Sequence, residues 1–205
     1  MSVPFVLASS SPRRREILSR ILSDFEVVPT RIDEAPIQSR TDLSPEGMVM
    51  HLALLKGRKT LESRPDALIL AADTMVFLDG VPMGKPKSME AAALMLKALQ
   101  GRTHDVYTGW CLMNSKTQIL SVSQSLVRIS PMSNEEIVDY VETGSPMDKA
   151  GAYGIQDSEY IQATVLKGSL TNVMGLPLED VQMTLQKHFP EVELKPDPDF
   201  GIGRL

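Results

Sequence analysis

This chain of 205 residues has a single cysteine, only three histidines and no apolar run long enough to cross a membrane. One cysteine excludes an internal disulfide, and so few Cys and His residues exclude a structural zinc site. The sequence lacks an apolar stretch of about 18 residues, and no basic segment precedes a hydrophobic one near Met1. We therefore expect a cytoplasmic protein with no secretory signal and no membrane partner.

Positive charge is also scarce, since 26 acidic residues outnumber 21 basic ones and the net charge is −5. A general nucleic-acid binder is usually basic, so we expect no nucleic-acid partner. Hydrophobic residues at 42% and charged residues at 23% are typical of a globular protein, and the length suits one domain. We place this domain at residues 1–189. A loosely ordered tail is expected at 190–205, which carries three prolines and little periodicity.

Strand and helix patterns alternate along the chain. Apolar strand patterns lie at 5–8, 25–28, 67–78, 105–113, 119–129 and 161–166, and helical patterns begin at Ser11, Ser44, Ser88, Ser133 and Pro177. The polar segment 29–43 is expected to be a loop. Because 105–113 and 119–129 follow each other directly, we predict an α/β fold with a mixed, twisted sheet.

The segment after the first strand pattern indicates an anionic ligand. Ser11 suits a helix N-cap and Pro12 the first helical position, so Arg13, Arg14 and Arg15 lie in the first turn. Cations are disfavoured there by up to ~1 kcal/mol each, whereas anions are favoured. Backbone N–H groups, serine hydroxyls and guanidinium groups would together form a phosphate site. A solvated basic turn is the alternative.

Asp73 interrupts a strand pattern that remains apolar on both sides of it. A carboxylate in a central strand is costly unless it is paired, hydrogen-bonded or bound to a metal, so Asp73 is a functional candidate. Lys56 is a second candidate because it shares the inward face of a helix with Val49, Leu52 and Ala53. A solvent-facing aspartate at a strand end and a lysine snorkelling at the edge of the core are the alternatives.

Three further segments suit a nucleotide site, although ordinary loops use the same residues. Lys85 lies between a glycine and a proline, and Asp33 and Glu34 could supply a metal ligand from the polar loop. Segment 148–156 bears glycines that allow close approach of a ligand, and it ends at Gln156, whose amide can pair with a base edge.

Two common nucleotide and hydrolase motifs are missing, namely the P-loop and the Gly-x-Ser-x-Gly elbow. What remains is an arginine-rich helix start, a carboxylate in an apolar strand, lysines and a glycine-bearing loop. This set suits metal-assisted attack of water on a phosphoanhydride, with cations neutralising charge and a carboxylate taking the proton.

Taken together, these segments resemble the Maf family of nucleoside triphosphate pyrophosphatases. The matching segments, in the family's order across about residues 4–188, are 7–14, 72–74, 85–86, 101–104 and 148–156. The resemblance implies a mixed α/β fold in two lobes with a central nucleotide cleft, similar to that of the inosine-triphosphate pyrophosphatases. It also implies hydrolysis of the α–β phosphoanhydride to a monophosphate and pyrophosphate, with Mg²⁺ or Mn²⁺ as cofactor, and a homodimer.

The resemblance assigns roles to individual residues. The proton acceptor falls on Asp73, further catalytic positions on Lys56 and Lys85, substrate contacts on Ser9, Arg13, Arg14, Thr74 and Gln156, and the metal on Glu34 and Asp73. The residues at 13, 74 and 156 resemble the branch that acts on dTTP and UTP, so we predict a pyrimidine nucleoside triphosphate as substrate. The alternatives are a purine such as 7-methyl-GTP and a non-catalytic, nucleotide-binding regulator of cell division.

Two positions depart from the family's usual residues. Gly57 stands where alanine is usual, and the exchange is expected to loosen the helix by ~1 kcal/mol. Asp157 stands where glycine is frequent, and it could alter the loop that carries Gln156.

Overall fold

The structure, a computed structural model, describes residues 3–195. Its strands are β1 (Phe5–Ala8), β2 (Glu26–Val27), β3 (Leu68–Leu78), β4 (Val81–Met83), β5 (Thr103–Met113), β6 (Gln118–Ile129) and β7 (Ala163–Lys167). Its helices are α1 (Pro12–Ser19), α2 (Ala35–Gln38), α3 (Pro45–Ser63), α4 (Met89–Leu99), α5 (Asn134–Glu142), α6 (Leu170–Val173) and α7 (Leu178–His188). Two 3₁₀ turns, η1 (Ser145–Asp148) and η2 (Ala150–Ala152), precede β7.

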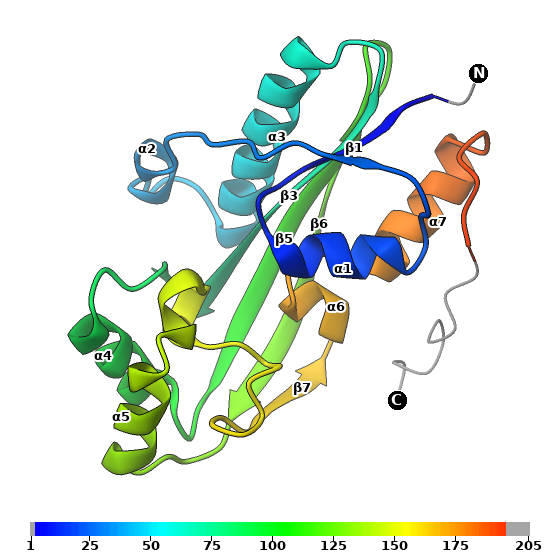
Figure 1. The fold of residues 1–205 in the computed structure, drawn as a ribbon. Coiled ribbons are helices and arrows are strands. Elements are labelled where there is room, and N and C mark those ends of the chain that lie inside the picture. The colour runs from blue at the N-terminus through cyan, green and yellow to red at the C-terminus, as the bar shows by residue number, and fades with distance from the viewer. Residues whose placement is uncertain (1–2, 196–205) are drawn as a thin grey trace.

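All seven strands belong to one mixed sheet, which confirms the predicted α/β fold. The order is β2-β1-β3-β5-β6-β7, and β4 pairs with the end of β3. β1 runs parallel to β2 and β3, whereas β3, β5, β6 and β7 pair antiparallel in succession. In Figure 1, β3, β5 and β6 extend through the molecule, with α1 and α7 near one end and α4 and α5 near the other.

The alternating side chains of β3 pack against different helices on the two faces of the sheet. On one face Leu70 lies in a core with α1 and α7, and further along Val76 lies in a second core with α4 and α5. On the other face Ala71 and Phe77 both pack with residues of α3. One face is therefore divided between two hydrophobic cores that meet near the middle of β3.

The middle of β3 has a free edge. β1 pairs with β3 as far as Ala71, and β4 pairs with the same edge only from Val76 onwards. Among residues 3–195, no strand pairs with this edge between Ala72 and Met75. Side chains from both faces of β3 can therefore reach one opening at this edge.

Helix α3 packs closely on β5 because each element has a glycine at the contact, Gly57 in α3 and Gly109 in β5. A Cβ atom on Gly109 would come within 2.3 Å of the carbonyl carbon of Val49. A Cβ atom on Gly57 would lie 2.7 Å from both Cys111 Sγ and Met113 Sδ. Gly57 therefore permits the close packing of α3 on β5. The prediction from the sequence considered only the lower helix propensity of glycine and not this packing.

Helix starts were predicted well, and short elements were not. Ser11 and Ser44 cap α1 and α3, and Ser133 forms the predicted capping box with Glu136. The segment expected to be a loop, 29–43, contains α2, which has only four residues and no apolar period to reveal it. The sequence analysis also did not predict β4 or α6.

The end of the described chain packs against α1. Val192 and Leu194 contact the core beneath α1 and α7, and the Lys195 N–H donates to the Ile21 carbonyl at 2.8 Å. The rest of the tail predicted from Pro190 onwards, residues 196–205, lies outside the described residues. Within 3–195, no helix combines the length and apolarity that a membrane span requires.

Candidate active site

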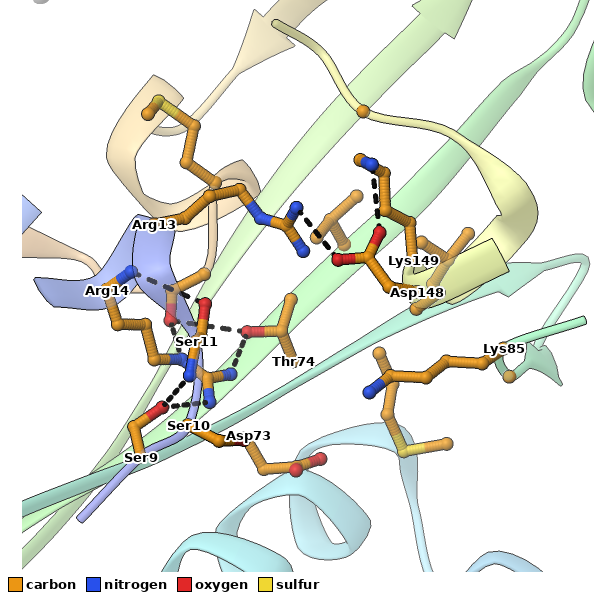
Figure 2. A pocket seen from close by; sticks show the side chains of 18 of the residues that line it. Ser9, Ser10, Ser11, Arg13, Arg14, Asp73, Thr74, Lys85, Asp148 and Lys149 are labelled. Atoms are coloured by element: carbon orange, nitrogen blue, oxygen red, sulfur yellow. Dashed lines mark hydrogen bonds and ion pairs between the residues drawn. The ribbon is translucent and has the colours of Figure 1, made fainter. Parts of the chain in front are cut away.

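A cavity of about 540 Å³ opens at the free edge of β3. Its volume is in the range of small-molecule sites. It brings together the residues to which the family resemblance assigns a role: Ser9, Arg13, Arg14, Glu34, Lys56, Asp73, Thr74, Lys85 and Gln156. Asp33, predicted with Glu34 as a possible metal ligand, does not line the cavity. Figure 2 shows how the end of β1, the start of α1, β3 and the segment around Asp148 surround this space.

Two carboxylates meet at the ammonium group of Lys56. Lys56 Nζ donates to Asp73 Oδ1 and lies 2.7 Å from Glu34 Oε1. Lys56 reaches them from α3, whose close approach to β5 places it beside the middle of β3. The side chains of Asp73 and Lys56 are only 8% and 11% exposed, so they form a buried ion pair rather than a solvated one.

Burial and neighbouring charges act in opposite directions on the pKa of Asp73. Burial raises the pKa of Asp73, and the positive charges of Lys56 and Arg14 oppose this rise. A carboxylate with a raised pKa is a better proton acceptor near neutral pH than a solvated one. Asp73 can thus serve as a general base, and the snorkelling and strand-end alternatives do not describe this pair.

The carboxylates of Asp73 and Glu34 also fit a divalent cation that arrives with phosphate. Mg²⁺ is usually held by one or two carboxylates together with substrate phosphates, rather than by a cage of protein ligands. Among residues 3–195, no group of three or more His, Cys, Asp or Glu side chains could hold a metal ion. The remaining ligands would therefore be phosphate oxygens and water.

Arg14 is held by three hydrogen bonds that fix its guanidinium group (Figure 2). Its Nε donates to the Gly175 carbonyl at 2.7 Å, its Nη2 to Thr74 Oγ1 at 3.0 Å and its Nη1 to Ser9 Oγ at 3.4 Å. Thr74 Oγ1 is also 2.9 Å from Thr108 Oγ1. The Thr74 hydroxyl thus contacts protein atoms that orient Arg14.

Four more cationic residues line the cavity: Arg13, Arg31, Lys85 and Lys149. Arg13 Nη1 lies 3.5 Å from Asp148 Oδ2, and Lys149 Nζ donates to Asp148 Oδ1 at 2.9 Å. Lys85 extends into the cavity (Figure 2), and within residues 3–195 its ammonium group has no hydrogen-bond partner. Lys85 is therefore free to bind an anion. Arg15 is exposed and does not line the cavity.

The roles of Asp148 and Lys149 were missed by the sequence analysis. Both line the cavity, and the charged entry to the glycine-bearing segment was the signal that could have revealed them. The same segment ends in a turn, closed by the Asp157 N–H donating to the Gly154 carbonyl at 3.0 Å. Gln156 lies within this turn, exposed at the cavity.

The comparisons with known proteins agree with this geometry. The family model described as Maf-like protein matches residues 4–188. The dTTP/UTP pyrophosphatase of Symbiobacterium thermophilum is 42% identical over 90% of this chain and 94% of its own length. Proteins of the same name from Caldicellulosiruptor saccharolyticus and Thermococcus gammatolerans are 42% and 43% identical, over 89% and 85% of this chain and 93% and 91% of theirs.

Proposed function

This chain belongs to the Maf-like protein family, and we propose that it hydrolyses the α–β phosphoanhydride of dTTP and UTP to a nucleoside monophosphate and pyrophosphate. The observation that carries the proposal is the buried ion pair of Asp73 and Lys56, which faces Arg14 and Lys85 in one cavity. A proton acceptor among cations is the arrangement that phosphoryl transfer to water requires.

In the proposed reaction the cations hold the triphosphate and Asp73 accepts the proton of water. Lys85 and Arg14 bind phosphate oxygens, and Lys56, as the ion-pair partner of Asp73, favours the ionised carboxylate that takes up the proton. A water oxygen forms a bond to the α-phosphorus while its proton passes to Asp73. The bond from the α-phosphorus to the bridging oxygen breaks, and pyrophosphate leaves with the electron pair.

We propose Mg²⁺ or Mn²⁺ as the cofactor, which Asp73 and Glu34 would hold together with substrate phosphates. Such an ion would neutralise negative charge on the phosphate oxygens. Lys56 contacts both carboxylates, so it would balance their charge when no nucleotide is bound.

The proposed preference for a pyrimidine base rests on Gln156 and Arg13, which both line the cavity. Gln156 is exposed at the cavity, and no hydrogen-bond partner for its side chain exists within residues 3–195, so its amide is available to a base edge. Arg13 lines the same cavity and forms an ion pair with Asp148, which begins the segment 148–156 that ends at Gln156. We assign Thr74 a different part, that of holding Arg14 through its hydroxyl.

Product analysis with a panel of bases tests this function. The purified chain is incubated with Mg²⁺ or Mn²⁺ and, separately, with dTTP, UTP, CTP, GTP or 7-methyl-GTP, and pyrophosphate is measured against single phosphate. We expect pyrophosphate from dTTP and UTP, little from the purines, and none after chelation of the metal. Release of single phosphate would place the cleaved bond elsewhere, and tight binding without any release would favour a nucleotide sensor.

A further inference from the structure

The turn that carries Gln156 is closed by its own backbone. The Asp157 N–H donates to the Gly154 carbonyl at 3.0 Å, which leaves Ile155 and Gln156 as the two central residues. Both line the cavity. Since the Gln156 side chain has no hydrogen-bond partner in the described part of the chain, its direction depends on how the ends of the turn are held.

Both ends of this turn meet at one phenolic oxygen. The Gly154 N–H donates to the hydroxyl of Tyr140 at 3.0 Å, and this hydroxyl donates to Asp157 Oδ2 at 2.5 Å. Ser145 Oγ donates to the same carboxylate oxygen at 2.8 Å. Tyr140 is fully buried in α5, so the position of its hydroxyl is fixed by the packing of its ring.

The same group of hydrogen bonds extends to the second residue proposed to contact the base. Lys149 Nζ donates to Ser145 Oγ at 3.0 Å and to Asp148 Oδ1 at 2.9 Å. Asp148 in turn forms the ion pair with Arg13 on α1. One chain of polar contacts therefore connects Arg13 on α1 with the two ends of the turn that carries Gln156.

Tyr140 and Asp157 themselves do not line the cavity. Any effect they have on a bound nucleotide must therefore pass through the residues that they hold. Hydrogen bonds to a charged group in a low-dielectric interior are stronger than those in water, so this arrangement restrains the turn.

We infer that the Tyr140 hydroxyl and the Asp157 carboxylate form a clamp that positions Gln156 and so determines how strongly the site binds the base of the nucleotide. Both are positioning residues rather than catalytic ones. The inference rests on the proposed function for the identity of the substrate. It also gives a purpose to Asp157, which departs from the glycine frequent at this position of the family.

The test separates recognition of the base from binding of the phosphates. The dissociation constants of the α,β-imido analogue of dTTP and of inorganic tripolyphosphate are measured calorimetrically for the wild-type chain and for Tyr140→Phe. We expect the dissociation constant of the nucleotide analogue to rise about tenfold, as for the loss of one hydrogen bond between Gln156 and the base. The constant for tripolyphosphate, which has no base, should change less than about twofold on the same scale.

Tyr160→Phe is the matched control. The Tyr160 ring stacks on that of Tyr140 with centroids 5.6 Å apart, but its hydroxyl has no hydrogen-bond partner within residues 3–195. This control should bind both ligands as the wild-type chain does. Asp157→Asn, which keeps the shape of the side chain and removes its charge, should weaken binding of the nucleotide analogue relative to tripolyphosphate, as Tyr140→Phe does. It carries the test if Tyr140→Phe does not fold.

Three results would overturn the clamp: unchanged affinities in both variants, equal losses for the analogue and for tripolyphosphate, or a wild-type chain that binds the two equally well. A wild-type chain that prefers the analogue but releases no pyrophosphate from dTTP would instead contradict the proposed function. In that case the binding measurements would still decide whether the clamp exists.

Discussion

The charges at the centre of the cavity depend on one another. Asp73 and Glu34 share the ammonium group of Lys56, and Arg14 is held by Ser9, Thr74 and Gly175 (the last through its carbonyl). Removing one member of a buried pair leaves the other charged and without a counter-ion. Single substitutions here should therefore have large effects.

Lys56→Met should reduce both stability and turnover. Asp73 would remain buried without its counter-ion, which costs about 3–5 kcal/mol in unfolding free energy where a buried pair is broken. Urea unfolding and pyrophosphate release measure the two losses. Lys97→Met, at an exposed position of α4, is the control and should change neither. A Lys56→Met chain with wild-type turnover would show that the ion pair is structural only.

Thr74→Val should lower kcat/KM by about tenfold for every nucleoside triphosphate alike, because it removes the hydroxyl that holds the charged Arg14, a bond worth about 1.5 kcal/mol. Thr74→Ser keeps the hydroxyl and should keep most of the activity. Steady-state kinetics with UTP, CTP and GTP make the comparison. A loss confined to the pyrimidines would mean that Thr74 contacts the base directly.

At the scale of elements, the position of Lys56 depends on how closely α3 packs on β5. Gly57 and Gly109 make this approach possible, and the contact places α3 against the face of β3 to which Asp73 belongs. Helix propensity alone gives the opposite expectation for Gly57, since alanine favours a helix by about 1 kcal/mol.

Gly57→Ala should destabilise the chain by about 1–3 kcal/mol, because its Cβ would lie 2.7 Å from two sulfur atoms in a packed core. Gly47→Ala in the first turn of the same helix is the control, since its nearest neighbour would be Ser44 Oγ at 3.5 Å, an ordinary contact. Urea unfolding compares them. If both substitutions stabilise the chain, the close packing of α3 on β5 is wrong.

The sequence predicted the elements with a clear signal and missed those without one. Each clear signal spans only neighbouring residues and can be recognised locally. Examples are the N-cap Ser11, the long apolar pattern that includes Asp73, and the capping box at Ser133. The four-residue helix α2, which follows Glu34 directly, is too short to show a period.

At the scale of the whole molecule, the convergence of the site could not be read from local patterns. The cavity exists because β1 leaves β3 after Ala71 and β4 joins it at Val76, and this register depends on pairing between distant segments. The residues that line the cavity together were predicted from the resemblance to a family, not from local patterns. The contacts of Asp148, Lys149 and Asp157 appear only when α5, η1 and the following turn are folded together.

The stability of the whole chain should depend on pH through His104. Burial lowers the pKa of His104 to about 4, and its ring nitrogen Nε2 pairs with the Tyr153 hydroxyl at 2.7 Å. In the unfolded chain the pKa of this histidine is about 6.5, so the unfolded chain binds more protons than the folded chain between pH 4 and pH 6.5. The contribution of His104 to the free energy of unfolding is thus fully present above about pH 6.5. It is lost as the pH falls to 4, which lowers the stability by up to about 3 kcal/mol.

Urea unfolding of the wild-type chain and of His104→Asn at several pH values measures this dependence. The wild-type chain should lose stability between pH 6.5 and 4, and the variant should lose less over the same interval because the buried titrating group is absent. Parallel losses in the two chains would assign the pH dependence to other groups.

Pyrophosphate release from dTTP by Asp73→Asn is the measurement that shows whether Asp73 accepts the proton of the attacking water. We expect a folded variant that still binds the α,β-imido analogue but releases pyrophosphate at least about a hundredfold more slowly, the range of general-base catalysis. Asp139→Asn, at an exposed position of α5, should keep the wild-type rate. An Asp73→Asn chain that releases pyrophosphate at the wild-type rate would contradict the account.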